Sequence, residues 1–336
     1  MLEQVSLKPF NTFGINAFAK YFAEFNNAES LGELLSSEIA TTEKLFILGG
    51  GSNILFTKNF DGLVLKNDIK GILKIDEDES HVYIKAGAGE SWHGFVEYCL
   101  ANNYAGIENL SLIPGSTGAS PMQNIGAYGV ELKDIFHCLD AFHIKDKTIV
   151  AFDNKSCEFG YRDSVFKNKY KGQFIITSVT YRLNKIPSLN ISYGAIKQEL
   201  DKMNVQNISI QQIANAVINI RRSKLPDPTE IGNAGSFFKN PVVDATTFKL
   251  LQQSFPGIIG HNVYGENVKL AAGWLIESCG WKGYRKGDAG CHEKQALVLV
   301  NYGNASGDEI LALSEKIMQS VKQKFNVSLE REVNIL

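Results

Sequence analysis

The sequence lacks any apolar run that approaches the roughly 20 residues needed to cross a bilayer. Residues 1–10 already include Glu3 and Lys8, and they have no apolar core of the kind found in signal peptides. A basic excess is absent too, because 34 Lys and Arg stand against 36 Asp and Glu, for a net charge of −2. These absences argue against a membrane or nucleic-acid partner. They predict a cytoplasmic protein that holds any anionic ligand through a local site.

Cysteine is scarce, and its spacing fits no known framework. The five cysteines form no Cys-x-x-Cys pair: Cys99, Cys138, Cys157, Cys279 and Cys291. Neither a zinc site nor a set of disulfides is expected from this spacing. Cys291 beside His292 also supplies too few ligands for a structural metal. We therefore predict no metal site, and free thiols in a reducing compartment.

The length and the apolar content suit two or three globular domains. The chain has 336 residues, of which 44% are apolar. Apolar spacing predicts two kinds of element: helices near 31–39, 92–100 and 209–222, and strands at 45–48, 81–86 and 174–183. A capping-box pattern at Ser306 and Glu309 opens a further helix, and Pro226 and Pro228 mark a domain boundary. The mixture predicts an α+β fold.

A first glycine-rich segment follows the strand at 45–48. Gly49, Gly50 and Gly51 let backbone N–H groups converge on a phosphate, and Ser52 and Asn53 add polar side chains. No Gly-Lys-Ser/Thr follows, so this is not a Walker loop, and Ile54 stands where a dinucleotide fingerprint needs its third glycine. Taken alone, a triple-glycine segment is more often a plain structural turn.

A second glycine-rich segment runs from residue 111 to 129 and is too irregular for a helix or a strand. A long ordered loop usually has a functional cause such as wrapping a cofactor, although a surface loop is the alternative. The candidate cofactor contacts in it are Pro114, Gly115, Ser116, Thr117, Gly118, Gln123, Asn124, Gly126, Ala127, Tyr128 and Gly129.

Together these two segments resemble the FAD-binding domain of the vanillyl-alcohol-oxidase-like flavoproteins, whose glycine-rich loops embrace the FAD pyrophosphate. Five more segments continue the match in order: GYRDSVFK (160–167), RRSKLPDP (221–228), GNAGSFFKNP (232–241), KQALVLVN (294–301) and LEREV (329–333). Over nearly the whole chain this order is similar to the UDP-N-acetylenolpyruvoylglucosamine reductase family. ISYGAI (191–196) resembles the tyrosine loop of its longer type.

The resemblance implies a fold and a set of ligands. It implies an α+β chain with an FAD-binding domain in two subdomains, residues 1–66 (joined by 330–336) and 67–220, and a C-terminal α+β substrate domain at 221–329. Non-covalent FAD is expected on the two loops and Arg221, with NADPH as hydride donor. The expected partner is a small UDP-sugar, with no nucleic acid or membrane, and the protein is expected to be a monomer or weak oligomer.

The resemblance also implies an activity of cell-wall synthesis. NADPH reduces FAD, and the reduced flavin passes hydride to UDP-N-acetyl-3-O-(1-carboxyvinyl)-glucosamine, which becomes UDP-N-acetylmuramate. The resemblance places Arg162 and Glu332 near the substrate carboxylate and makes Ser236 the proton donor. Arginine offers a bidentate fork with a permanent charge, and a protonated glutamate is able to stabilise the enol. Without the surrounding motif, a buried structural serine would be the favoured interpretation of Ser236.

The remaining candidates would hold the substrate. Lys224, Asn240, Tyr193 and Gln295 are assigned to the UDP-sugar, chiefly its diphosphate, because lysine, amides and phenols donate to phosphate oxygens. Tyr161 is placed in the same pocket, and Lys224 is equally able to be a solvated lysine. Two other functions stay open: a flavin oxidase that uses oxygen, and a non-catalytic flavin- or nucleotide-binding regulator.

Overall fold

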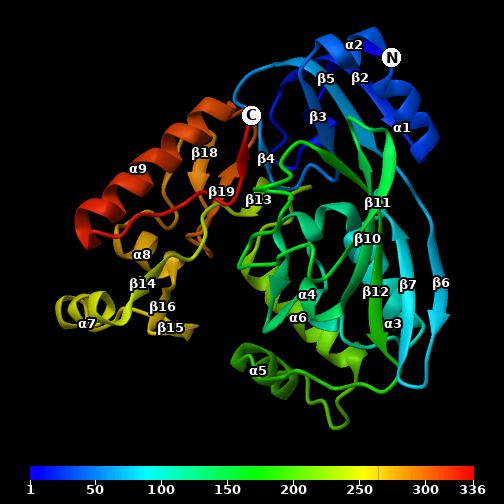
Figure 1. Ribbon diagram of the computed structural model, residues 1–336. Helices are drawn as coiled ribbons and strands as arrows, with labels where there is room; N and C mark the ends of the chain where they lie inside the picture. Colours follow the sequence, from blue (N-terminus) through cyan, green and yellow to red (C-terminus); the bar gives the residue numbers. More distant parts are fainter. Residues whose placement is uncertain (264) are drawn as a thin grey trace. The chain divides into compact units, whose positions relative to one another are not determined.

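The computed structural model describes residues 1–263 and 265–336. The chain divides into two compact units, which interleave along the sequence. The first contains residues 1–5, 19–50 and 61–223, and the second contains residues 6–18, 51–60 and 224–336. Figure 1 shows the elements of both. Three segments were expected from the sequence, at 1–66, 67–220 and 221–329. They are subdomains implied by the family resemblance, whereas the two units are defined by contacts, so the three-segment division stays a prediction.

The first unit contains two main sheets, ordered β1-β2-β5-β3 and β11-β10-β12-β7-β6, and a β8-β9 hairpin. Its strands are β1 (Leu2–Ser6), β2 (Phe18–Phe25), β3 (Leu45–Leu48), β5 (Phe60–Asn67), β6 (Ile72–Glu77), β7 (His81–Gly87), β8 (Gly126–Ala127), β9 (Val130–Glu131), β10 (Phe136–His143), β11 (Thr148–Asp153) and β12 (Phe174–Asn184). Its helices are α1 (Ala28–Leu35), α2 (Glu38–Thr42), α3 (Trp92–Ala101), α4 (Leu132–Ile135), α5 (Gly194–Lys202) and α6 (Ile210–Lys224), with short 3-10 turns at 108–110, 117–119 and 121–123.

The core of this unit forms where α3 covers the five-stranded sheet (Figure 1). Val82, Ile84 and Ala86 alternate along β7 with at most 2% exposure, as a half-buried strand requires. The rings of Trp92 and Phe95 on α3 pack on Tyr181 of β12, with centroids 5.8 and 4.5 Å from it. Burying a large apolar side chain contributes about 1.5–3 kcal/mol. The predicted strand at 81–86 and helix at 92–100 are confirmed.

The second unit contains sheets ordered β13-β19-β18-β17, β14-β16-β15 and β20-β4. Its strands are β4 (Ile54–Leu55), β13 (Gly232–Ser236), β14 (Val242–Asp244), β15 (Gly260–Val263), β16 (Asn267–Leu270), β17 (Arg285–Lys286), β18 (Ala289–Cys291), β19 (Val298–Asn301) and β20 (Asn334–Ile335). Its helices are α7 (Ala245–Ser254), α8 (Ala272–Ser278) and α9 (Gly307–Phe325), with a 3-10 turn at 8–10.

Two helix predictions had different outcomes. The capping box that opens α9 is confirmed, since Ser306 Oγ accepts from Glu309 N and the Glu309 carboxylate accepts from Ser306 N. The single helix expected near 31–39 is wrong, because α1 ends at Leu35 and α2 begins at Glu38. Ser37 is the reason: its hydroxyl accepts from Ala40 N and so caps a new helix. No helix within the described ranges is long and apolar enough to cross a membrane.

Candidate active site

The two glycine-rich segments contact each other within the first unit. A Cβ built on Gly50 would lie 2.7 Å from Gly115 Cα, and one on Gly49 would lie 2.7 Å from Ser116 Oγ. Such an approach admits only glycine at residue 50, because backbone meets backbone there. The segment predicted to hold a phosphate and the loop predicted to wrap a cofactor therefore lie against each other.

The second segment is fastened to the end of β7. Thr117 Oγ1 donates to Gly87 O at 2.5 Å, and Gly118 N donates to Ala88 O at 2.9 Å. Ser120 Oγ lies 3.1 Å from the hydroxyl of the fully buried Tyr181. These bonds satisfy polar groups of an irregular loop and keep it ordered.

The rest of the first glycine-rich segment belongs to the second unit. Gly51 has a φ of +64°, and a Cβ on it would overlap Phe10 O. Asn53 Nδ2 donates to Glu332 O at 3.2 Å, and Asn334 N donates to Asn53 O at 3.1 Å. Asn53 therefore joins the segment to the chain that carries Glu332.

Arg162 reaches the second loop inside the first unit. Its Nη2 donates to Gly126 O at 2.7 Å, and its guanidinium lies 5.7 Å from the centroid of the exposed Tyr161 ring. The Arg162 backbone has a φ of +55°. A non-glycine residue costs about 1–2 kcal/mol in this region, and such strain is characteristic of functional sites.

Arg221, at the C-terminal part of α6, lies close to Arg162, and burial next to another cation lowers the pKa of its guanidinium. Its Nε donates to Leu112 O at 3.1 Å, and its side chain is hydrogen-bonded to Tyr128. The Tyr128 ring in turn packs edge-on against Tyr193, with centroids 5.3 Å apart. The catalytic candidate Arg162, the cofactor candidates Arg221 and Tyr128, and the substrate candidate Tyr193 thus form one cluster within the first unit.

Two asparagines that the sequence analysis missed tie the tyrosine loop to the glycine-rich loop. Asn109 is 1% exposed, and its Nδ2 donates to Tyr128 O at 2.9 Å and to Asn190 O at 3.0 Å. Asn190 Nδ2 donates to Gly129 O at 3.1 Å. These bonds hold the segment just before Tyr193 beside Tyr128. No local pattern in the sequence predicted them.

The second unit brings Ser236 and Glu332 onto paired segments. Ser236 ends β13 opposite Val298, after a ladder irregularity in which Gly235 has a φ of +69°. The next residue, Phe237, accepts at its carbonyl oxygen from Glu332 N at 2.8 Å. The two predicted catalytic residues, far apart in sequence, therefore lie on neighbouring segments joined by this backbone hydrogen bond.

Asn240 and Gln295 each lie beside the start of α8. Asn240 Oδ1 accepts from Ala272 N at 2.9 Å, and a Cβ on Gly273 would lie 3.1 Å from Gln295 Oε1. Gln295 Oε1 also accepts from Leu297 N at 3.4 Å. Because both amide oxygens accept from backbone N–H groups, the NH₂ ends are the ones that remain for a ligand. Lys224, at the end of α6, is exposed.

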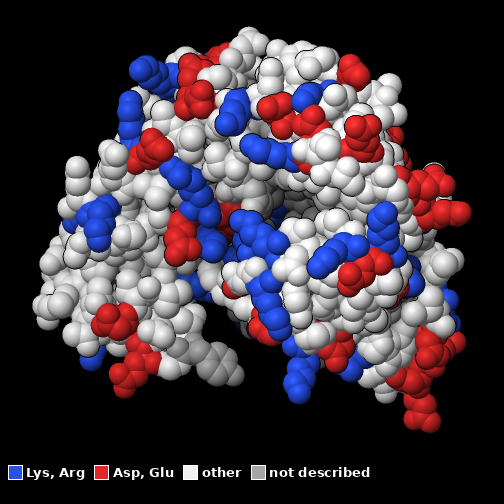
Figure 2. Space-filling model, turned by 45° about the horizontal axis from the view of Figure 1, so that its top comes forward, with Lys and Arg blue, Asp and Glu red and all other residues white. Residues whose placement is uncertain are grey.

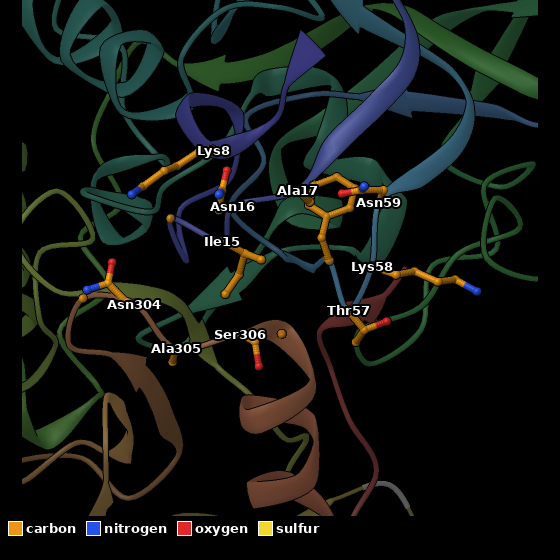
Figure 3. A pocket seen from close by; sticks show the side chains of 14 residues that line it. Lys8, Ile15, Asn16, Ala17, Thr57, Lys58, Asn59, Asn304, Ala305 and Ser306 are labelled. Atoms are coloured by element: carbon orange, nitrogen blue, oxygen red, sulfur yellow. The ribbon is translucent and has the colours of Figure 1, made fainter. Parts of the chain in front are cut away.

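The second unit also has a hollow away from these residues. A cavity of about 280 Å³ lies at the first turn of α9, and Lys8, Lys58, Asn59 and Ser306 are among its lining side chains (Figure 3). Among the described residues, none of the sequence-predicted site residues lines it. The capping box already satisfies N–H groups of that turn. The face drawn in Figure 2 carries Lys and Arg as well as Asp and Glu side chains.

Comparison with known proteins follows the division of the chain. A family model described as an FAD binding domain matches residues 19–148. A second, described as the C-terminal domain of UDP-N-acetylenolpyruvoylglucosamine reductase, matches residues 227–336. The matched domain and the two glycine-rich loops therefore define an FAD-binding flavoprotein, as expected from the sequence.

Full-length relatives are more specific. The UDP-N-acetylenolpyruvoylglucosamine reductase of Amoebophilus asiaticus (strain 5a2) is 49% identical over 334 residues, 99% of this chain and 98% of the relative. That of Flavobacterium johnsoniae is 50% identical over 332 residues, 98% of each. The chain belongs to the UDP-N-acetylenolpyruvoylglucosamine reductase family. A crystal structure of the enzyme from Thermus caldophilus shares the fold, with a TM-score of 0.69 at 23% identity over 100% of this chain and 98% of that one.

Proposed function

We propose that the protein is the FAD-dependent oxidoreductase that converts UDP-N-acetyl-3-O-(1-carboxyvinyl)-glucosamine to UDP-N-acetylmuramate for peptidoglycan synthesis, with Arg162, Ser236 and Glu332 as its catalytic residues. NADPH is the hydride donor. The observation that carries the assignment of roles is the pairing of the Ser236 and Glu332 segments through Glu332 N and Phe237 O. Bound FAD supplies the hydride chemistry between NADPH and the enolpyruvyl group.

Each catalytic side chain has one task in this proposal. Arg162 is held at Gly126 through Nη2 and presents a permanent charge to the substrate carboxylate. Negative charge develops on the carbon beside that carboxylate when hydride arrives, so a fixed cation there stabilises the transition state. Ser236 donates the proton to this carbon, and Glu332 in its protonated form donates a hydrogen bond to the enol oxygen.

The binding residues divide by chemistry. The NH₂ groups of Asn240 and Gln295, the ammonium of Lys224 and the hydroxyl of Tyr193 donate to the diphosphate. Tyr161 lines the same pocket. The contact of Gly49 and Gly50 with the loop at 115–116 supports FAD binding by both glycine-rich segments. The group at FAD then comprises Gly49–Asn53, Pro114–Gly118, Gln123, Asn124, Gly126–Gly129 and Arg221.

The setting of the enzyme is the second part of the proposal. We infer a cytoplasmic protein that acts as a monomer or weak oligomer. All five cysteines are free thiols, which suits a reducing compartment. Sedimentation of the purified protein measures the oligomeric state.

The function is tested by mixing the purified holoenzyme with NADPH and following absorbance with and without the enolpyruvyl substrate. We expect a yellow protein that releases intact FAD on heating, and steady NADPH oxidation only when the substrate is present. Equal oxidation with oxygen alone would indicate a flavin oxidase instead. FAD binding without any turnover would indicate a binding protein.

Removing the proposed diphosphate contacts should weaken substrate binding. Lys224→Ala and Tyr193→Phe each delete a single donor, so we expect the substrate KM to rise about tenfold for a lost charged or phenolic hydrogen bond. Steady-state kinetics measures this, with Lys202→Ala on α5 as an exposed-lysine control that leaves KM unchanged. A residue whose replacement leaves KM at the wild-type value would be removed from the binding group.

A further inference from the structure

His93 on α3 contacts the start of the second glycine-rich segment, and the proposed function leaves it without a role. Its Nδ1 lies 3.0 Å from Leu112 N. A backbone N–H only donates, so Nδ1 must be the unprotonated acceptor and the proton must reside on Nε2. The hydrogen bond therefore exists only with the neutral imidazole.

Leu112 is held at both of its peptide groups. Its N–H donates to His93, and its carbonyl oxygen accepts from Arg221 Nε at 3.1 Å. Its φ is +58°, which is unfavourable for a residue with a branched side chain. Such a conformation persists only when surrounding bonds impose it. The hydrogen bond from Leu112 to His93 is one of those bonds, and Leu112 lies two residues before Pro114.

We propose that His93 is a positioning residue that, through Leu112, holds Arg221 in place for FAD, and that protonation of His93 weakens FAD binding. The proposal rests on the role of Arg221 as an FAD contact. Arg221 continues the network to Tyr128, whose carbonyl oxygen is held by Asn109. Loss of one bond at Leu112 therefore loosens the segment that bears the cofactor contacts.

The charges around His93 set the direction of the pH effect. Burial lowers the pKa of His93, and Arg222 and Arg221 on α6 lower it further, whereas Glu97 on its own helix, 3.6 Å from Nε2, raises it. The net shift is downward, so the ring is neutral at neutral pH and accepts from Leu112. FAD affinity is then highest above the pKa of His93 in the folded protein, where the ring is neutral. It falls as the pH drops through that pKa, which lies below the ordinary histidine value of about 6.5.

The test titrates apoprotein with FAD and measures Kd by flavin fluorescence between about pH 5 and about pH 8. His93→Asn keeps an acceptor, because Asn Oδ1 takes the place of Nδ1, but it does not titrate. We expect near-wild-type Kd at about pH 8 and a flat pH profile for it. His93→Phe removes the acceptor and should raise Kd about tenfold at every pH, the effect of one lost buried hydrogen bond.

His143→Asn is the matched control, since His143 on β10 is also half-buried beside a carboxylate, with Nδ1 2.8 Å from Asp146 Oδ2. It should keep the wild-type pH profile. Thermal unfolding of each apoprotein separates misfolding from loss of affinity, and the soluble Asn variant decides the matter if the Phe variant unfolds. A wild-type pH profile in His93→Asn would overturn the proposal.

Arg221→Met distinguishes the role of Arg221 at FAD from the positioning role of His93. If it leaves Kd for FAD unchanged, the role of Arg221 at FAD fails and this inference fails with it. If it weakens FAD while His93→Asn still follows the wild-type profile, the role of Arg221 stands and only the His93 proposal is refuted.

Discussion

Ser236→Ala should leave the reduction of flavin by NADPH near normal and slow its reoxidation by the enolpyruvyl substrate by about 10²–10⁴-fold. That is the usual contribution of a positioned general acid, equivalent to about 3–5 kcal/mol of transition-state stabilisation. The reason for the asymmetry is that NADPH oxidation requires no proton on the sugar, whereas the carbanion formed in the second half-reaction does. Stopped-flow absorbance at the flavin band follows the two phases separately.

A structural serine provides the control for this experiment. Ser314 on α9 is fully buried, and its hydroxyl donates to Leu311 O and accepts from Arg331 Nε. Ser314→Ala should lower thermal stability and leave the ratio of the two rates unchanged. If Ser236→Ala slows both phases equally, Ser236 is structural, and an unaltered second phase would remove it from the mechanism.

Gly50→Ala should yield a folded protein that has largely lost FAD. The added Cβ would lie 2.7 Å from Gly115 Cα and 2.9 Å from Gly115 C, and neither atom belongs to a flexible side chain. Overpacking of this kind costs about 1–3 kcal/mol. If the strain is relieved by separating the two loops, FAD affinity falls by about ten- to a hundredfold. Titration of apoprotein with FAD measures the loss.

Gly32→Ala is the matched glycine control. A Cβ there would lie 3.6 Å from the Phe142 ring, which is ordinary contact, and Gly32 is inside α1, where alanine is the better helix former. It should bind FAD like the wild type. An equal FAD content in the Gly50 and Gly32 variants would show that the contact between the two glycine-rich segments is not needed for the cofactor.

Local sequence patterns predicted secondary structure correctly where a few neighbouring residues determine it. The alternation of Val82, Ile84 and Ala86 predicted β7, because side chains of a strand face alternate sides and one side is buried. Ser306 and Glu309 predicted the start of α9, because the two side chains satisfy N–H groups within a single turn. The same reasoning failed at Ser37, where spacing of apolar residues concealed a second cap.

No local pattern in the sequence predicted the hydrogen bonds of His93 and Asn109. His93 lies on the partly polar side of α3 and acts on Leu112, and Asn109 bonds to Tyr128 and to Asn190. These partners are 19 to 81 residues apart, so only the folded chain identifies them. The division into units has the same origin, because Gly51 and Phe10 belong with residues that follow Lys224.

The sequence by itself determined the family, the two glycine-rich segments and the identity of the candidate residues. The backbone freedom of a glycine and the chemistry of a side chain are properties of a single residue, so they can be recognised without the folded structure. Tertiary structure decided which of them meet. Gly50 lies against Gly115, Ser236 follows Gly235 beside the Glu332 segment, and His93 holds Leu112 in a left-handed conformation. Contacts of this kind depend on chain closure over long separations, and no short window of sequence contains both partners.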